Sequence, residues 1–567
     1  MIVRMKHLDL ICLASEKDAT LARLRTLGAV HLDLASAAGA SVTSAEGALA
    51  DAEKAVRLIL KARGKERGLE IRPRTVAEVL ELDADRATLA AEQARLEREI
   101  RVYAPYGDFD PTLAAKLRAT VDGLEKVVEL PEKLPEMRLS RMEEKLVRVK
   151  NRRAIDEVKI ASVDEKPILK AYPEIRDRIA FAQARELLAD RGALAVLSGW
   201  IPEPRVVALL DEVHGNSGDL FARSETIGWA VLLRDPASGE TPPTLIEPPR
   251  FFKSVKVLFE GLGVAPAYTE ADVSVPFMCY FSLFFAMLVG DGAYGLIFLV
   301  ATLALRKRLP RSWFVLLTVF SSATILWGVL SNTWFGVGLS FFASLPTVTW
   351  LADPSYNHMM LLCFTIGVTH LMLARLWNGI CKWPDSTALA EFGWAGVLLT
   401  MYLVTNAIVG IFPVFPPWGL WLGSVSVIMV FLFSVKPSEL KTHGAELGML
   451  PLNIMSALGD VISYVRLFAV GLASVKVAEN FNDMALGFLS WSDSVWVKPA
   501  LAVAMVAILL VGHGLNLVMA GLSILVHAVR LNTLEFSNHK GITWSGFAFN
   551  PFRSVSVVST NRKENKT

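Results

Sequence analysis

Two apolar segments near the C-terminal end of the chain contain charged residues that could take part in ion chemistry. In LPLNIMSALGDVISYVRLFAVGLAS (450–474), Arg466 lies about 16 residues into the run and follows Asp460, Ser463 and Tyr464. An arginine at that depth costs roughly 3 to more than 10 kcal/mol in hydrocarbon unless a partner or a water-filled cavity compensates its charge. Arg466 is therefore expected to face an acid or an ion path, or else to form an internal salt bridge with Asp460.

The second segment, ALAVAMVAILLVGHGLNLVMAGLSILVHAVRL (500–531), is apolar apart from five residues: His513, Asn516, Ser523, His527 and Arg530. At 100° per residue, these five lie within about 100° of one another and form one stripe along a helix. The stripe is longer than one snorkelling side chain requires, which favours a polar path. Taken singly, Arg530 could anchor the end of its helix, and His513 could be a hydrogen-bonded packing residue.

The elements that position these segments follow from the distribution of charge and apolar residues. Of the 114 Asp, Glu, Lys and Arg residues, 83 lie before position 267. We therefore expect a cytoplasmic domain over 1–266 and a membrane domain over 267–567. The expected fold class is mostly α: an N-terminal α/β domain and a polytopic membrane domain of about eight transmembrane helices, the last two long and tilted. Apolar runs of spanning length occur at 313–331, 359–378, 392–412, 418–434, 450–475 and 500–530.

A further apolar run, 274–305, is interrupted by GDGAYG (290–295). One straight helix of that length would reach roughly 48 Å, more than a hydrocarbon core of ~30 Å, so a hairpin of two short helices is expected. Loop charge supports the hairpin, because basic residues follow alternate segments whereas 332–358 and 413–417 contain no Lys or Arg. This predicts eight segments and a cytoplasmic C-terminus. The basic residues are Arg306, Lys307, Arg308, Arg311, Arg375, Lys382, Lys436 and Lys441.

The N-terminal half combines strand and helix patterns. A strand is expected over Lys6–Leu13, then a charged helix capped by Ser15, a second strand over Val30–Leu34, and a later strand over Ala193–Trp200 before a helix that begins near Pro204.

A pair of helical arms is expected between these strands. Apolar residues recur with helical spacing, the turn PYGDFDP (105–111) interrupts the pattern, and a helical stretch follows over Thr112–Lys150. The pattern predicts a long antiparallel helical hairpin, a spacer that could also act as a strut. The apolar residues are Leu49, Ala52, Val56 and Ile59 in one segment and Leu82, Leu89 and Leu96 in the next.

Several functions are excluded by composition and motif. The sequence contains neither a GxxxxGK[ST] phosphate loop nor a GxGxxG fingerprint, so the chain is not expected to hydrolyse ATP itself. No cofactor or metal site is predicted, because Cys12, Cys279, Cys363 and Cys381 are scattered and are interpreted as buried small hydrophobic residues. The first fifteen residues lack a signal-peptide cleavage pattern, and a net charge of +2 suggests no nucleic-acid partner.

The segments with the two arginines also resemble a known family. SYVRLFAVGLAS (463–474) and HAVRLNTLEF (527–536) closely resemble the last two transmembrane helices of subunit a (subunit I) of V/A-type rotary ATPases. The stretches GDGAYG, SGWIPEP (198–204), PPTLIEPPRFF (242–252) and YGDFDP are similar to other parts of the family, so the resemblance covers nearly the whole chain.

The resemblance implies partners and residue roles. The chain would lie beside a rotating ring of proteolipid subunits, with Arg466 as the essential arginine opposite the ring and Arg530 as the second arginine. His527 matches a half-channel position, and Glu535 lies just beyond it. Relatives often have a carboxylate upstream on the last helix; 500–529 has none, so His513 and Asn516 are candidates for the outer half-channel. The soluble half would contact the peripheral stalk subunits and the cap subunit of the central rotor.

Electrostatics gives this assignment a mechanism. Each ring subunit would bring a carboxylate into the membrane, neutral while it carries an ion, and Arg466 would favour its ionised form. The ion leaves through one half-channel, the ring steps, and another ion enters from the other side. Arginine suits the role because it remains protonated when buried.

The sequence therefore predicts a stator subunit without a nucleotide site, moving protons rather than Na⁺ across the plasma membrane of a prokaryote. A self-contained secondary transporter is the first alternative, although the sequence lacks the matching broken halves typical of that class. A membrane-anchored scaffold is the second, for which the polar stripe would have no use.

Overall fold

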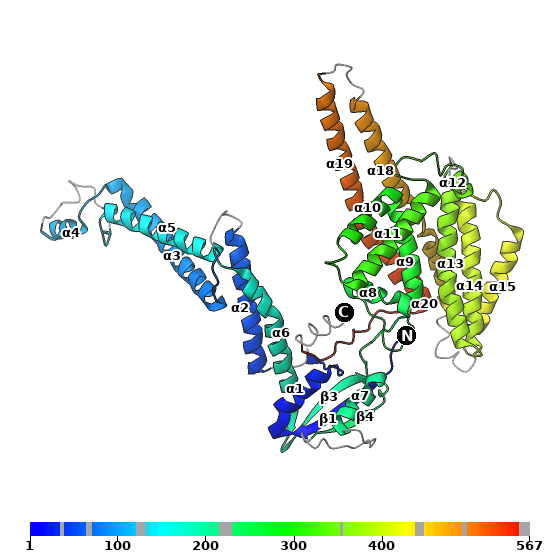
Figure 1. Cartoon of the computed structure of the whole chain (residues 1–567), viewed down its shortest axis with the longest axis horizontal. Coiled ribbons are helices and arrows are strands. Elements are labelled where there is room, and N and C mark those ends of the chain that lie inside the picture. Colours follow the sequence, from blue (N-terminus) through cyan, green and yellow to red (C-terminus); the bar gives the residue numbers. More distant parts are fainter. Residues whose placement is uncertain are drawn as a thin grey trace. The chain divides into compact units, whose positions relative to one another are not determined.

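The computed structural model describes residues 1–34, 39–63, 71–120, 131, 133–214, 229–351, 355–436, 447–489 and 496–554. The chain forms two compact units (Figure 1). One unit contains residues 5–237 and 550–567, and the other contains residues 1–4 and 238–549. Each unit is therefore built from two separate pieces of sequence.

The first unit is organised around a four-stranded antiparallel sheet in the order β2-β3-β1-β4. Along β1, Leu8, Leu10 and Cys12 are buried, and the alternation is that of a strand with one face on a core. Helices α1 and α7 pack on strands of the sheet. The bounds are β1 Met5–Leu13, β2 Ala189–Arg191, β3 Leu194–Pro202, β4 Trp229–Arg234, α1 Lys17–Leu27 and α7 Glu203–His214.

Two local predictions in this unit are wrong. The segment Val30–Leu34 is not a strand: only His31 forms a bridge, exchanging backbone hydrogen bonds of 2.8 and 2.9 Å with Trp200. Ser15 does not cap α1, because a 3₁₀ turn over Ala14–Glu16 precedes the helix and Glu16 takes the cap position without a side-chain hydrogen bond.

Four helices extend from the sheet, and Figure 1 shows them as two pairs, α2 beside α6 and α3 beside α5. Buried Ala52, Val56 and Ile59 of α2 form a core with residues of α3, α5 and α6, as their spacing predicts. A capping box of Thr75 and Glu78 begins α3. The bounds are α2 Ala40–Arg63, α3 Val76–Tyr103, α5 Leu139–Ala161 and α6 Glu165–Leu187.

The predicted continuous helix over Thr112–Lys150 is wrong. Helix α4 covers Pro111–Thr120 and α5 begins only at Leu139, while 131 and 133–138 are not helical. Pro131 and Pro135 account for the interruption, because proline lacks the N–H that a helix interior needs. The intervening residues 121–130 and 132 lie outside the described ranges.

The second unit contains the apolar helices, several of which stand side by side in Figure 1. Five of the described helices, counting continuous runs, are long and apolar enough to cross a membrane, and α15 is a shorter apolar helix. They are α11 Arg311–Ser331, α13 Asn357–Lys382, α14 Thr387–Ile408, the run Leu450–Phe488 and the run Lys498–Lys540, with α15 at Pro417–Phe433. Short helices α8 (Val255–Leu262) and α12 (Pro346–Leu351) accompany them. Arg375 lies inside α13 rather than in a loop, and Lys441 lies outside the described residues.

The glycine-rich break expected within 274–305 is present. Helices α9 (Ser274–Val289) and α10 (Gly292–Ala304) are bent by 118° at the break. Gly290 takes a left-handed conformation there, and Asp291 caps α10 by accepting a hydrogen bond of 2.8 Å from the Ala293 N–H. The crossing of the membrane by both helices, and the total of eight segments, remain predictions.

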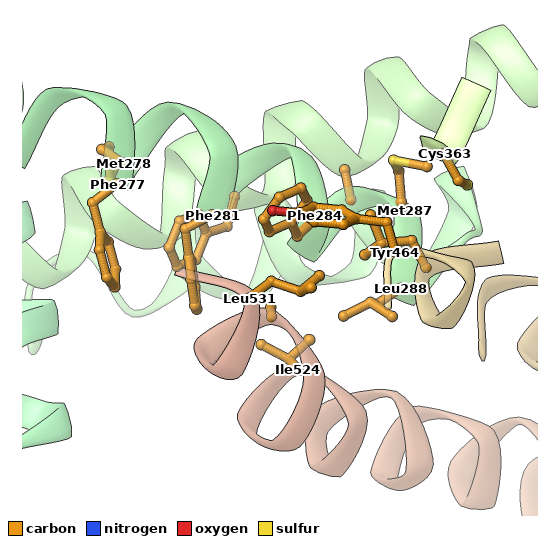
Figure 2. Close-up of a cluster of buried hydrophobic side chains, with 14 of the residues drawn as sticks. Phe277, Met278, Phe281, Phe284, Met287, Leu288, Cys363, Tyr464, Ile524 and Leu531 are labelled. Carbon is orange, nitrogen blue, oxygen red and sulfur yellow. The ribbon is translucent and has the colours of Figure 1, made fainter. Parts of the chain in front are cut away.

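Helix α9 supplies much of the core of this unit. Phe277, Phe281 and Phe284 project from it, and Figure 2 shows Phe281 beside Leu531 and Phe284 beside Tyr464, from the last two apolar segments. The segments that carry the arginines are therefore held against α9. The interpretation of the cysteines as buried is right for Cys12 and Cys363 but wrong for Cys279 and Cys381, which are exposed. Cys279 and Val275 lie on the same side of α9, and both are exposed there.

Candidate functional site

A break between two helices positions Arg466. Helix α17 covers Leu450–Ile462 and has Ser463 as its C-cap, and α18 (Val465–Leu489) begins immediately after Tyr464. The Tyr464 ring is fully buried, and its hydroxyl lies 2.8 Å from Nδ1 of His370 on α13. Gly367, also on α13, leaves room for this ring. Arg466 donates from Nε to the Ser463 carbonyl at 2.9 Å, and this hydrogen bond ties the Nε end of the guanidinium group to the turn.

A change of helical type positions the second arginine. Helix α19 (Lys498–Ser523) is followed by two π-helical segments, η7 (Ile524–Ala528) and η8 (Leu531–Phe536), and then by the short α20 (Ser537–Lys540). In an α-helix, residues five apart differ by about 140° around the axis, whereas the i→i+5 pattern of a π-helix places them nearly above one another. Arg530 and Glu535 are five apart, and the π-helix brings them together.

The two arginines converge on one carboxylate oxygen. Arg466 Nη2 lies 2.6 Å from Oε1 of Glu535, and Arg530 Nε lies 3.5 Å from the same oxygen. The exposed side-chain fractions are 5% for Glu535, 21% for Arg466 and 56% for Arg530. Glu535 Oε2 is buried and has no hydrogen-bond partner among the described residues. The carboxylate is thus almost completely enclosed, while one of its arginines is open to the outside of the chain.

Asp460 does not pair with Arg466, which the sequence left open as an internal salt bridge. Its carboxylate lies 3.0 Å from Nε2 of His539 in α20. Arg375 Nε donates at 3.1 Å to Nδ1 of the same imidazole, so the ring acts as acceptor there and directs its Nε2–H to Asp460. Arg375 Nη1 also bonds Glu391 of α14 at 3.1 Å, and Lys382 bonds the other oxygen of Glu391 at 2.5 Å. A network of charged and polar side chains thus runs from Asp460 to Lys382, at the C-terminal end of α13.

Four members of this network were not predicted as site residues: His539, Arg375, Glu391 and Lys382. Glu391 immediately precedes the apolar run 392–412, so the apolar pattern placed it outside that segment. Arg375 and Lys382 were interpreted as loop charges. His539 lies beyond the last apolar run, so its sequence position gave no signal either.

A second polar cluster lies toward the other end of α18. Tyr294 of α10 places its hydroxyl 2.7 Å from His513 Nδ1 and accepts a hydrogen bond of 3.1 Å from Asn516. His513 Nε2 lies 3.2 Å from Asn482 Oδ1, and Asn516 also donates to the Ser474 carbonyl at 2.8 Å. Asn482 is sixteen positions beyond Arg466, roughly 24 Å along the helix. The structure therefore brings His513 and Asn516 together, but away from Arg466.

The predicted single stripe on the last helix is not maintained. Asn516 is fully buried, His513, Ser523 and His527 are half-buried, and Arg530 is exposed. His527 Nδ1 is buried and unpaired within the described part of the chain. The π-helical segments change the number of residues per turn, so a projection at 100° per residue fails beyond Ser523. Among the described residues, no group of three or more His, Cys, Asp and Glu side chains could hold a metal ion.

Comparison with known proteins gives a consistent result over the whole length. The chain is 28% identical to V-type ATP synthase subunit I 1 of Treponema pallidum (strain Nichols), over 98% of this chain and 100% of that protein. It is 32% identical to V-type ATP synthase subunit I of Borreliella burgdorferi, over 68% of this chain and 64% of the other. A-type ATP synthase subunit I of Methanocaldococcus jannaschii is 25% identical, over 75% and 65%.

The chain is a homologue of subunit I of V- and A-type ATP synthases. No protein-family model matches it. As a subunit I homologue with five helices capable of crossing a membrane, it is a multi-pass membrane protein that belongs to a multi-subunit complex.

Proposed function

We propose that this subunit I homologue is the stator membrane subunit of a rotary ATPase or ATP synthase. It forms two ion half-channels, for protons, beside a ring of proteolipid subunits, and it has no catalytic activity by itself. The observation that carries the proposal is the convergence of Arg466 and Arg530 on Glu535, at the exposed side of the last two apolar segments.

The last apolar segment is uncovered, as a surface facing a membrane partner should be. In the segment Lys498–Lys540, 11% of the most apolar window is buried within this chain, against 33–50% in the other four candidate spans. Arg530 belongs to this segment, and 56% of its side chain is exposed. A charge at such a position requires a partner or water, and an acid-bearing rotor supplies one. The exposed apolar residues of the segment include Val503, Val506, Leu510, Leu515, Val518, Leu522 and Leu525.

The two polar clusters lie on opposite sides of Arg466 along the chain and would be the half-channels. The cluster around Asp460 and His539 ends at Lys382, in the basic region that loop charge assigns to the cytoplasm. The cluster around His513 reaches the loop after α11, where Asn482 donates to the Phe335 carbonyl at 2.5 Å. Residues 332–358 contain no Lys or Arg, as expected outside the cytoplasm.

The chemistry follows from the fixed charge between these clusters. A rotor carboxylate that arrives opposite Arg466 is favoured in its ionised form and releases its proton into one cluster. After a step of the ring, the next carboxylate takes a proton from the other cluster. Because a guanidinium group does not lose its proton, Arg466 also separates the two paths.

The remaining assignments complete the proposal. The complex lies in the plasma membrane of a prokaryote, with the N-terminal unit and the C-terminus in the cytoplasm. The helical arms of that unit link the membrane part to the peripheral stalk subunits and to the cap of the central rotor. Salt bridges of 2.6 and 3.0 Å between α3 and α5, Glu92–Lys145 and Glu97–Lys150, would stiffen such an arm only modestly, because both are exposed.

The proposal is tested on the complete complex purified through this chain and reconstituted into liposomes. A proteolipid ring should co-purify, and ATP should drive acidification of the vesicles. Arg466→Ala should abolish acidification while the ring still co-purifies, and Arg311→Ala, at an exposed arginine at the start of α11, should retain it. Transport by this chain alone would support the transporter alternative. A complex without a ring, or sustained acidification by Arg466→Ala, would refute the proposal.

A further inference from the structure

The pairing of Arg466 is at odds with the role that the proposed function gives it. A guanidinium group that must meet a passing rotor carboxylate is already bound to Glu535 within this chain, at 2.6 Å. If Arg466 turns to the rotor, it leaves behind a carboxylate with only 5% of its side chain exposed. A buried charge without a counter-charge is strongly unfavourable, so an exchange of partners is needed.

We propose that Glu535 is a counter-ion handed between the two arginines: it holds Arg466 while no rotor carboxylate is opposite, and Arg530 takes it over when Arg466 engages the rotor. This inference rests on the proposed function and adds a positioning role to the same site. It assigns to Arg530 the neutralisation of Glu535 rather than direct contact with the ion.

Arg530 is placed for this exchange. Its Nε lies 3.5 Å from the Glu535 oxygen that Arg466 binds, close enough to attract the carboxylate but longer than a strong charged hydrogen bond. With 56% of its side chain exposed, Arg530 has space to move. The unpartnered Glu535 Oε2 offers a second acceptor, so the carboxylate can bind one arginine before it releases the other.

Among the described residues, the ion pairs of Glu535 are those with Arg466 and Arg530, so Arg530 is the cation available to take over the carboxylate. Asp460, the neighbouring acid on α17, is engaged by His539 and does not compete for Arg466. The Nε bond to the Ser463 carbonyl holds the base of the Arg466 side chain while its terminal nitrogens change partner.

A charge-exchange mechanism makes a prediction that a structural salt bridge does not. Without Arg530, Glu535 has one cation left and should hold Arg466 away from the rotor. Arg530→Gln should therefore slow ATP-driven acidification about tenfold, equivalent to ~1.4 kcal/mol. Removal of the acid as well, in Arg530→Gln/Glu535→Gln, should release Arg466 and raise the rate at least about threefold above that of Arg530→Gln.

The experiment compares these variants in reconstituted complexes, with rates divided by the amount of proteolipid ring that co-purifies. Arg530→Gln/Glu391→Gln is the matched control, because Glu391 is also enclosed and also bonds two cations, Arg375 and Lys382. This control should be no faster than Arg530→Gln. Arg530→Lys, which keeps the charge, should retain at least about a third of the wild-type rate, and it provides a second comparison if Arg530→Gln reduces assembly.

A double variant as slow as Arg530→Gln or slower would overturn the exchange, as would an Arg530→Lys complex no faster than Arg530→Gln. Either result would leave the proposed function intact if Arg466→Ala still abolished acidification. Acidification by Arg466→Ala would instead refute the proposed function.

Discussion

The contact between Gly367 and Tyr464 provides a test of how packing positions Arg466. A Cβ atom at position 367 would lie 2.4 Å from Cγ of the Tyr464 ring and 2.6 Å from Cδ2. Ordinary contacts between carbon atoms begin near 3.4 Å, so Gly367→Ala requires the ring to retreat by about 1 Å. Cγ and Cδ2 lie at the base of the Tyr464 ring, which is fully buried. A shift of these atoms therefore also shifts the turn that carries Arg466.

Two magnitudes follow from this displacement. Overpacking of a dense core costs about 1–3 kcal/mol, which should lower the thermal midpoint of the detergent-solubilised complex. A misplacement of about 1 Å at a reacting group can lower a rate ~100-fold, so ATP-driven acidification should fall by between tenfold and 100-fold.

The assay measures both quantities on the same preparation: thermal unfolding by tryptophan fluorescence and acidification by a pH-sensitive dye. Gly261→Ala on α8 is the control, because its new Cβ would have no neighbour closer than 4.0 Å. Wild-type acidification by Gly367→Ala would show that the position of Arg466 does not depend on the Tyr464 ring.

Three further predictions concern stability. Asp291→Ala removes the cap of α10 and a hydrogen bond of 2.8 Å to the Gly336 N–H, and should cost about 2–4 kcal/mol in thermal unfolding, whereas Asp291→Asn should cost less. Thr75→Ala should cost about 1 kcal/mol and speed hydrogen exchange at the first turn of α3, and Thr75→Ser should not. Burial lowers the pKa of His31 from its ordinary value of 6.5, so the unfolded chain binds more protons below that pH. The stability of the structure around His31 should thus be fully present above pH 6.5 and decline as the pH falls. The decline should appear as faster hydrogen exchange of the Phe552 amide, after correction for the intrinsic exchange rate. His31→Leu should remove this pH dependence.

The sequence alone predicts a charged part and an apolar membrane part, and its apolar runs single out both arginines as candidate site residues. These conclusions are local: the cost of burying a charge in hydrocarbon depends on one residue and its apolar neighbours along the chain. The break at GDGAYG was predictable from the length of its apolar run, and Gly290 adopts the left-handed conformation there without strain. The resemblance around Arg466 and Arg530 agrees with the full-length similarity to subunit I.

Tertiary structure decided which groups those arginines meet. Asp460 lies six residues before Arg466, but it bonds His539, 79 positions away, because both α17 and α20 pack on α13. Tyr294 and His513 are 219 positions apart, and no spacing rule joins them. Arg466 and Arg530 share the carboxylate of Glu535 because the chain is π-helical there, and the residues between Arg530 and Glu535 do not predict a π-helix from sequence. Partner choice is set by packing across elements, whereas the presence of an unpaired charge can be recognised from one segment alone.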